Sequence, residues 1–265
     1  KKNKVKNVVC FNYLFALQFI SERFFFKEKF KIIVRNNTIL TNHLNFNLKN
    51  VFFKNLIFWI VKLLYSRVDH LISQNEEMKI DLIKNFSFMK DKINIFLNPI
   101  DQIIEDSYDQ KKIFKENYIL LVGRLSQEKR YDIAIKVFRN VRQKFSNLKL
   151  KIAGIGKDES FLKELAYKYG INENIEFLGY QKDLVTLYKK ARLTLITSSY
   201  EGFPNVMIES LFLGTPVVSF DFKSGPREVI RDGINGFLVN NNDESSLEQK
   251  IVESLNNDWD IEIIH

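Results

Sequence analysis

The sequence predicts an α/β fold in which parallel sheets are covered by helices. Short runs rich in β-branched residues alternate with segments of helical periodicity, which is typical of doubly wound sheets. The chain has 265 residues, 45% of them hydrophobic, so it can bury one large core or two modest ones, and we expect two lobes. The strands are expected at residues 31–34, 69–73, 93–98, 118–123, 148–154, 174–179, 193–197 and 216–221. The helices between the later strands are expected at 131–145, 158–169, 182–191 and 205–213.

The boundary between the lobes is predicted in residues 98–117, where Pro99 disfavours helix and polar residues accumulate. This segment is interpreted as a linker between a first lobe at 1–97 and a second at 118–265. The first lobe offers only about three strands, fewer than the roughly 5–6 of a typical sheet, so we expect it to be incomplete at its N-terminus. The chain begins with Lys1 rather than Met, which also suggests a fragment.

Composition limits the classes of function. Cys10 is the single cysteine, which excludes an intramolecular disulfide and favours a reducing compartment such as the cytoplasm. The three histidines, His43, His70 and His265, show no zinc spacing. Residues 1–98 hold 17 Lys and Arg against 7 Asp and Glu, a net charge of +10, whereas the remainder is −2. The basic lobe therefore suggests an anionic partner, and because no nucleic-acid motif accompanies it, a phospholipid surface is the preferred interpretation.

Two apolar segments lie in the basic lobe. The run from Val8 to Ile20 is too short to span a bilayer, which needs roughly 20 apolar residues, and we expect a buried strand, a turn and a helix there. The segment from Val51 to Val68 has helical periodicity and is predicted to dock on an anionic membrane; the alternative is that its stripe is the core face of a helix. The stripe consists of Phe52, Phe53, Leu56, Ile60, Leu63 and Leu64, flanked by Lys54, Lys62 and Arg67.

Two cations follow the predicted strand 118–123. In GRLSQEK, Gly123, Arg124 and Lys129 are expected at the carboxyl edge of a parallel sheet, where open α/β sheets bind ligands. A guanidinium can bind two phosphate oxygens at once and an ammonium adds a mobile charge, so the pair suits a diphosphate. The alternative is a solvated loop between strand and helix.

The next loop, GIGKDE, contains Gly154 and Gly156, which permit a close approach of backbone to ligand and an anion-binding helix start. Glu159 stands where a dinucleotide fingerprint needs a third glycine, so that fingerprint is not matched. A plain left-handed turn is the alternative.

A third motif is EGFPNVMIES, which begins with Glu201. Its helix should start near Pro204 or Asn205, and the free N–H groups of the first turn could bind an anion. Glu201 and Glu209 could accept hydrogen bonds from sugar hydroxyls, or they could be an ordinary helix-start acid and a surface residue.

Taken in order, these pieces resemble the donor-binding half of retaining GT-B glycosyltransferases of family four. The resemblance spans about residues 69–258 and includes FLG at 177–179, GTPVV at 214–218 and DGINGFLV at 232–239. Glu201 and Glu209 match the Glu-x7-Glu signature of that family. The fold implied is two Rossmann-like doubly wound parallel-sheet lobes, the first incomplete.

The resemblance implies a function and a site. A sugar, with UDP-linked hexose or N-acetylhexosamine as the preferred donor, would pass to a glycan or a polyprenyl- or lipid-linked acceptor with retention of anomeric configuration. The catalytic residues implied are Glu201, Arg124 and Lys129. The donor-binding residues implied are Gly123, Gly154, Gly156, Tyr180, Gln181, Gly202, Phe203, Pro204, Asn205 and Glu209. Glu209 would hold the ribose, Glu201 would stabilise the oxocarbenium-like transition state, and Tyr180 with Gln181 would lie beside the base.

The resemblance also implies that neither a metal nor a cofactor is needed, because fixed cations neutralise the diphosphate. The expected role is in polysaccharide or lipopolysaccharide synthesis, in the cytoplasm or peripherally on the inner face of the membrane.

The sequence departs from the family at three places. No glycine-rich loop opens the first lobe, Arg35 occupies the region where many relatives carry a histidine, and the long C-terminal helix is not matched. Arg35 is assigned to the acceptor side. Two alternatives to a competent transferase stay open: a fragment that binds nucleotide-sugar without transferring it, and a GT-B-like nucleotide-sugar epimerase.

Overall fold

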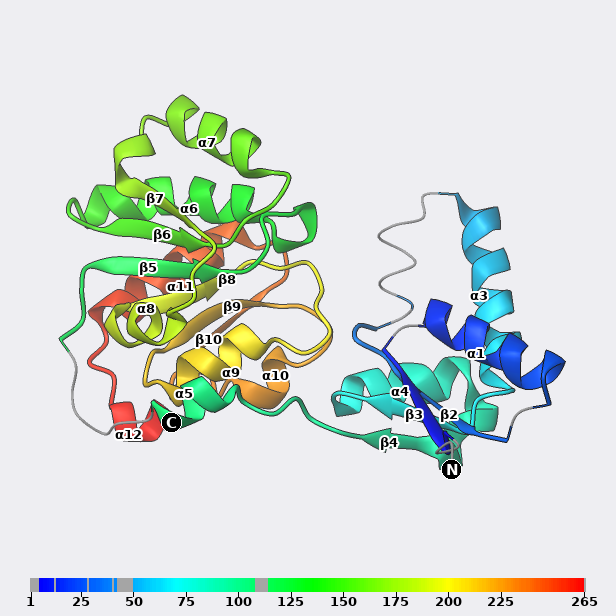
Figure 1. Cartoon of the computed structure of the whole chain (residues 1–265). Coiled ribbons are helices and arrows are strands. Elements are labelled where there is room, and N and C mark those ends of the chain that lie inside the picture. The colour runs from blue at the N-terminus through cyan, green and yellow to red at the C-terminus, as the bar shows by residue number, and fades with distance from the viewer. Residues whose placement is uncertain are drawn as a thin grey trace. The chain divides into compact units, whose positions relative to one another are not determined.

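The computed structural model describes residues 5–11, 13–27, 29–39, 41, 50–107 and 114–264. The chain forms two compact units (Figure 1). The first comprises residues 1–98 with the short segments 201–203 and 223–225, and the second comprises 99–200, 204–222 and 226–265.

The first unit contains a parallel sheet of four strands in the order β1-β2-β3-β4. Its elements are β1 (Asn7–Cys10), α1 (Tyr13–Phe25), β2 (Lys31–Arg35), α3 (Val51–Tyr65), β3 (His70–Ser73), α4 (Glu76–Asn85), the 3-10 helix η1 (Ser87–Lys92) and β4 (Ile93–Ile95). The strand, turn and helix expected from the run at 8–20 are present as β1 and α1. The described sheet thus has one strand more than the expected three, and β4 ends at Ile95 rather than at 98.

Asparagine side chains start two helices of the first unit. Asn50 Oδ1 accepts from the backbone N–H of Phe52 at 2.9 Å, and Asn75 Oδ1 accepts from that of Met78 at 2.7 Å. Each bond satisfies an amide that has no partner within its helix, so α3 and α4 begin where the sequence supplies a cap.

Both faces of α3 are apolar, and only one packs on the core. Val61 and Tyr65 are buried, and Ile57 and Phe58 pack against the same cluster. The opposite face is exposed and consists of Phe52, Phe53, Leu56, Trp59, Ile60 and Leu63. All but one residue of the predicted stripe therefore point away from the core, and the exception is the half-buried Leu64.

The second unit contains a parallel sheet of six strands in the order β10-β9-β8-β5-β6-β7. Its strands are β5 (Tyr118–Val122), β6 (Lys149–Ala153), β7 (Ile175–Gly179), β8 (Leu193–Ile196), β9 (Val217–Asp221) and β10 (Gly236–Asn240). Its longer helices are α6 (Tyr131–Lys144), α7 (Glu159–Lys168), α8 (Leu184–Lys190), α9 (Asn205–Phe212) and α11 (Glu244–Asn256). The short helices are α5 (Gln102–Asp106), η2 (Gln127–Lys129), η3 (Asn172–Asn174), α10 (Pro226–Val229) and α12 (Ile261–Ile264).

The strand order creates a switch point. The chain runs from β5 outward to β7, returns to the other side of β5 for β8, and continues to β10, which is the doubly wound order of a dinucleotide-binding sheet. Ligands bind such sheets beyond the carboxyl ends of the two strands at the switch point, here β5 and β8. The expected fold class, an α/β fold with two parallel sheets, is confirmed.

Helices cover both faces of this sheet (Figure 1). Ile119 and Leu121 of β5 belong to a large core cluster with α6 and α11. Tyr118 and Leu120, which alternate with them, belong to a second cluster with α5 and α8. Because successive side chains of a strand point to opposite faces, β5 is buried on both sides and reads as a continuous apolar run.

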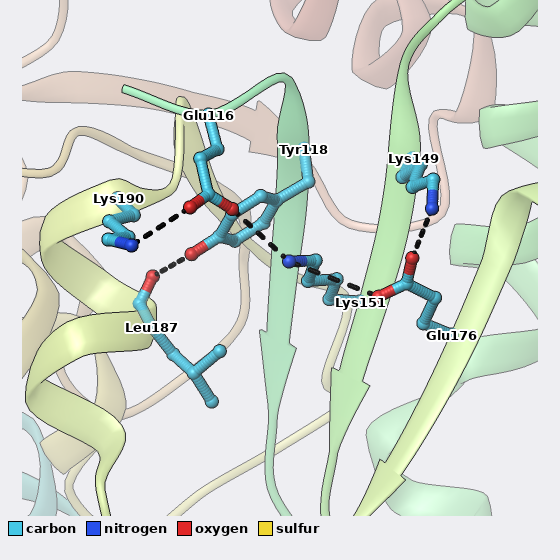
Figure 2. Close-up of polar contacts among 7 residues, drawn as sticks. All are labelled: Glu116, Tyr118, Lys149, Lys151, Glu176, Leu187 and Lys190. Carbon is cyan, nitrogen blue, oxygen red and sulfur yellow. Dashed lines mark hydrogen bonds and ion pairs between the residues drawn. The ribbon is translucent and has the colours of Figure 1, made fainter. Parts of the chain in front are cut away.

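A charged network spans the sheet near its amino edge (Figure 2). Glu116 accepts from Lys190 at 3.0 Å and from Lys151 at 3.4 Å, and Glu176 pairs with Lys149 at 2.5 Å and Lys151 at 3.9 Å. Glu116 precedes β5, Lys149 and Lys151 are the first and third residues of β6, Glu176 is the second residue of β7, and Lys190 ends α8. The network joins neighbouring strands at the edge opposite to the one where a ligand is expected.

Among the strands and longer helices of the second unit, β10 and α11 were not expected, and neither were its short helices. The expected helix 182–191 is shorter because Asp183 caps it, with Oδ1 accepting from the N–H of Thr186 at 3.1 Å. Among the described residues, no helix has the length and hydropathy required to cross a bilayer.

Candidate functional site

Glycines end three neighbouring strands of the second sheet. The N–H of Gly123, after β5, donates to Ala153 O at 2.9 Å, and that of Gly154, after β6, donates to Gly179 O at 2.8 Å. Gly123 and Gly154 have φ values of +145° and +149°, which side-chain-bearing residues rarely adopt. A Cβ on Gly154 would lie 1.8 Å from Gly123 O. The backbone at this edge is therefore packed to a density that only glycine permits.

The loop that contains Gly156 packs on the loop after β5. Leu125 N–H donates to Ile155 O at 3.1 Å, and Asp158 N–H donates to Leu125 O at 3.1 Å. A Cβ on Gly156 would lie 2.2 Å from Leu125 O. These contacts hold the two predicted glycine-containing loops against each other.

Lys129 lies at the switch point. It ends η2, and its Nζ lies 3.4 Å from the position that a Cβ on Gly123 would occupy. Ser199, after β8, donates its N–H to Glu128 O at 2.8 Å, and the Thr197 hydroxyl donates to Lys129 O at 2.8 Å. Because these bonds join the segment after β5 to the segment after β8, the tertiary structure fixes the backbone that carries Lys129.

Arg124 is placed differently. Its side chain is 81% exposed, and its Nη2 lies 3.7 Å from Glu128 Oε1. Glu128 also accepts from the Ser126 hydroxyl at 2.6 Å. Burial raises the pKa of Glu128, but the Ser126 hydroxyl, the backbone and the charges of Arg124 and Lys129 together hold it below its usual value. Sequence reasoning missed Glu128, a carboxylate between the two predicted phosphate ligands.

Tyr180 and Gln181 follow β7. Tyr180 is 71% exposed, and Gln181 Nε2 donates to Leu178 O at 2.6 Å. The bond from Gly154 to Gly179 O brings this segment next to the Gly154 loop. The structure thus assembles the predicted residues of three strand ends at one edge.

Helix α9 begins at Asn205 after Pro204, as predicted. The N–H of Met207 donates to Pro204 O at 2.9 Å, and the cap residue makes no side-chain bond to the helix. The Ser210 hydroxyl is hydrogen-bonded to the Thr194 hydroxyl at 2.7 Å and to Thr215 O at 2.9 Å. These bonds anchor α9 to the end of the sheet.

Glu209 is a half-buried residue on α9. Its Oε2 accepts a hydrogen bond of 2.9 Å from the hydroxyl of Tyr188, a fully buried residue on α8. Burial raises the pKa of Glu209 above its ordinary value, the Tyr188 bond opposes that shift, and the negative charge of Asp101 adds to it. Burial and the charge of Asp101 therefore disfavour the ionised form of Glu209.

Glu201, Gly202 and Phe203 are grouped with the first unit. Gly202 O accepts from Asn75 Nδ2 at 3.3 Å, and a Cβ on Gly202 would lie 1.6 Å from Asn37 O. Glu201 thus belongs to the first unit and Glu209 to the second.

Arg35, the predicted acceptor-side residue, ends β2 in the first unit. Its Nη2 donates to Asn98 Oδ1, and its guanidinium lies 5.7 Å from the centre of the Phe11 ring. Among the described residues, no group of three His, Cys, Asp or Glu side chains is arranged to hold a metal ion.

Sequence comparison places the chain among known transferases. The profile of the family described as Glycosyl transferases group 1 matches residues 103–262. An uncharacterized glycosyltransferase of Methanocaldococcus jannaschii is 33% identical over 217 residues, which cover 78% of this chain and 52% of that protein. The N-acetylgalactosamine-N,N'-diacetylbacillosaminyl-diphospho-undecaprenol 4-alpha-N-acetylgalactosaminyltransferase of Campylobacter jejuni is 31% identical over 204 residues, covering 76% of this chain and 54% of that protein.

Solved structures share the fold. Anabaena HepE in complex with UDP and glucose superposes with a TM-score of 0.75 at 17% identity, covering 95% of this chain and 67% of that one. Staphylococcus aureus TarM in a complex that contains UDP gives 0.74 at 22% identity, covering 87% and 45%. These neighbours are GT-B glycosyltransferases, which confirms the predicted GT-B class.

The chain spans about half the length of the curated relatives it matches. The family profile covers the second unit from α5 to α12. This chain belongs to the family of glycosyl transferases group 1.

Proposed function

We propose that this chain carries the donor-binding part of a retaining glycosyltransferase of the family-four type. The donor is a nucleotide-sugar, and a UDP-linked hexose or N-acetylhexosamine is the preferred candidate. The observation that carries this proposal is the placement of Lys129 beside Gly123 at the switch point of the second sheet. A cation beside a half-buried glycine at that edge suits a diphosphate.

Each charged group has a role in this proposal. Lys129 and Arg124 neutralise the diphosphate, with Arg124 exchanging its weak contact to Glu128 for phosphate oxygens. An exposed ion pair contributes only about 0–1 kcal/mol, so this exchange costs little. Glu209 accepts hydrogen bonds from the ribose hydroxyls. Glu201 stabilises positive charge that develops at the anomeric carbon.

The reaction breaks the bond between the anomeric carbon and the diphosphate oxygen on the face where the acceptor attacks. The acceptor hydroxyl oxygen bonds to that carbon, and its proton passes to the departing phosphate oxygen. Configuration is thereby retained. We propose that the fixed cations stabilise the leaving diphosphate without a divalent ion, so EDTA should leave the rate unchanged, and a strict requirement for Mg²⁺ or Mn²⁺ would contradict this.

The acceptor is proposed to be a glycan or a lipid-linked glycan. The Campylobacter jejuni relative is named for an undecaprenol-diphosphate acceptor. A Staphylococcus aureus relative, 28% identical over 193 residues, is named poly(ribitol-phosphate) alpha-N-acetylglucosaminyltransferase. These names describe transfer and do not favour the epimerase or binding-fragment alternatives.

We also propose that the protein works in the cytoplasm, peripherally on an anionic membrane surface. The exposed face of α3 carries two phenylalanines, a tryptophan and three aliphatic residues, with Lys62 and Arg67 exposed nearby. Basic residues near an anionic surface contribute about 1 kcal/mol each, and the apolar side chains add burial in the headgroup region.

Calorimetric titration with UDP-, GDP- and ADP-sugars tests donor binding. In a thermal-shift measurement, the cognate donor at 100 times its dissociation constant should add about 2.7 kcal/mol to the free energy of unfolding. Transfer to a lipid-linked acceptor, followed by NMR of the anomeric proton, should show the configuration of the donor in the product. Absence of binding to all three donor classes, or an inverted product, would refute the proposal.

Glu201 is tested by a kinetic comparison. Glu201→Gln should lower kcat far more than it raises KM, because its partner is the reacting sugar. Glu201→Asp, which keeps the charge, should recover part of kcat. An equal effect of both variants on KM alone would remove Glu201 from catalysis.

A further inference from the structure

One side chain, Tyr188, donates a hydrogen bond to the carboxylate of Glu209. The hydroxyl of Tyr188 donates to Oε2 of that carboxylate at 2.9 Å. An ionised carboxylate has about four acceptor positions, so one bond from the protein leaves capacity for a vicinal diol.

Tyr188 is itself immobilised. Its ring has no exposed surface and belongs to the core cluster that includes Tyr118, Leu120 and Ala191. Its backbone carbonyl accepts a hydrogen bond of 2.6 Å from the Thr215 hydroxyl. A tyrosine has only two side-chain torsions, so packing of the ring and bonding of the backbone together fix the position of its hydroxyl.

The Thr215 hydroxyl is oriented by a third group. It accepts from Lys115 Nζ at 2.6 Å, and Lys115 also donates to Gly214 O at 3.1 Å. Because the hydroxyl hydrogen of Thr215 is directed to Tyr188 O, the ammonium must approach the oxygen lone pairs: Lys115 only donates, whereas the Thr215 hydroxyl donates once and accepts once. Contacts therefore link Lys115 through Thr215 to the backbone of Tyr188, whose hydroxyl bonds to Glu209.

We propose that Tyr188 is a positioning residue for the nucleotide: its hydroxyl orients the Glu209 carboxylate toward the ribose 2′- and 3′-hydroxyls. This inference rests on the proposed donor site and deepens it, since Tyr188 makes no contact with substrate itself. A hydroxyl donated to a carboxylate stabilises the charged form, which is the form that accepts from a diol.

The electrostatic surroundings of Glu209 give a second readout. Burial and the charge of Asp101 raise its pKa, and the Tyr188 hydrogen bond lowers it. Lys115 is a further charged group in these contacts, and its Nζ bonds to Gly214 O and the Thr215 hydroxyl. Removal of the Tyr188 hydroxyl should therefore raise the Glu209 pKa further. Nucleotide binding, which needs the ionised carboxylate, should then begin to weaken at a higher pH as the solution is acidified.

The experiment compares Tyr188→Phe with Tyr118→Phe. Tyr118 lies in the same core cluster, and its hydroxyl donates to Leu187 O of α8 at 2.6 Å (Figure 2), so its variant also removes one buried hydroxyl bond to α8 but leaves Glu209 untouched. Binding of UDP and of 2′,3′-dideoxy-UDP is measured by calorimetry from pH 5 to 8, as an assay range around the carboxylate pKa.

Tyr188→Phe should weaken UDP binding about tenfold, which corresponds to about 1.4 kcal/mol, leave the dideoxy nucleotide unaffected, and shift the acidic limb upward. Tyr118→Phe should change none of these. Combined with Glu209→Gln, Tyr188→Phe should add no further loss, because the two side chains act as a unit.

Three results would overturn the inference. Equal losses for UDP and its dideoxy analogue would show a general packing defect, and unchanged UDP binding would show that Glu209 needs no orientation. If the wild-type chain binds no nucleoside diphosphate among UDP, GDP and ADP, the proposed donor site fails and the role of Tyr188 fails with it. If the chain binds GDP or ADP instead of UDP, the same variants are compared with that nucleotide and its dideoxy analogue.

Discussion

Replacement of Gly154 by alanine should damage the carboxyl edge of the second sheet more than any other single methyl group added there. The new Cβ would lie 1.8 Å from Gly123 O and 2.8 Å from Gly123 C. Both are backbone atoms, and the Gly123 N–H is hydrogen-bonded to Ala153 O at 2.9 Å, so they cannot rotate aside. The loop must shift, or the strand ends must separate.

The magnitude follows from two contributions. A residue other than glycine at a φ of +149° costs on the order of 1–3 kcal/mol in backbone strain. Insertion of a methyl group into closely packed structure costs about 1–3 kcal/mol more. The loss of roughly 2–6 kcal/mol is a large part of the 5–15 kcal/mol by which a typical domain is stable.

Gly170→Ala is the matched control. Gly170 also has a positive φ, +66°, but a Cβ there would meet nothing within 4 Å. Its replacement keeps the left-handed strain of about 1 kcal/mol and omits the clash. The difference between the two variants therefore measures the contact with Gly123 together with the greater backbone strain at Gly154.

Urea unfolding followed by tryptophan fluorescence measures this difference. Trp259 reports on the second unit, because it packs on Phe237 at 5.5 Å and donates Nε1–H to Ser254 O at 2.9 Å. The chain has two tryptophans, so a Trp59→Phe background leaves Trp259 as the sole reporter. With a slope of about 1–3 kcal/mol per molar urea, Gly154→Ala should lower the midpoint by at least about 0.3 M relative to Gly170→Ala. Equal midpoints would refute the reasoning.

Three further predictions concern charge and the exposed helix face. Lys129→Ala should weaken UDP binding about tenfold and leave uridine binding unchanged, while Lys144→Ala, which removes a surface charge of the same unit, should alter neither; a parallel loss of uridine binding would make Lys129 structural. Burial lowers the pKa of Lys115 to about 8, so the folded chain binds fewer protons than the unfolded chain from there up to about 10.5, and stability should rise with pH across that interval. Lys115→Met should flatten this rise, and a pH slope identical to wild type would contradict the assignment. Phe53→Ser combined with Trp59→Ser should reduce co-sedimentation with anionic vesicles, which should itself fall as salt is added; binding insensitive to salt and to both substitutions would remove the proposed membrane role of α3.

The secondary structure of the second unit was largely predictable from local patterns. The expected strand 118–123 is β5 at Tyr118–Val122, and the expected helix 205–213 is α9 at Asn205–Phe212. Apolar β-branched runs, helical periodicity and a proline before the helix are local signals that act within a few residues. The special backbone positions of the glycines in the two loops were also predictable, because a left-handed or crowded backbone position excludes other residues whatever the rest of the fold.

The faces of α3 could not be assigned in this way. Both of its sides are apolar, so periodicity identifies a helix but does not select the side that packs. The tertiary structure buries Val61 and Tyr65 and leaves Phe53 and Trp59 exposed. The choice depends on which residues of the sheet and of α1 meet the helix, and that information is not local.

The contacts of the candidate site were decided by strand order. The sequence by itself determined that Lys129 follows one strand and that Glu209 lies on a helix after another. The bond from the Ser199 hydroxyl to Glu128 O joins residues 71 positions apart, and the bond from Tyr188 to Glu209 joins residues 21 apart. Such bonds form because the chain returns to the other side of β5 and places β8 beside it. A buried tyrosine in an apolar stretch carries no local sign of the carboxylate that it will meet, since hydrogen-bond energy depends on distance in the folded state rather than on separation along the chain.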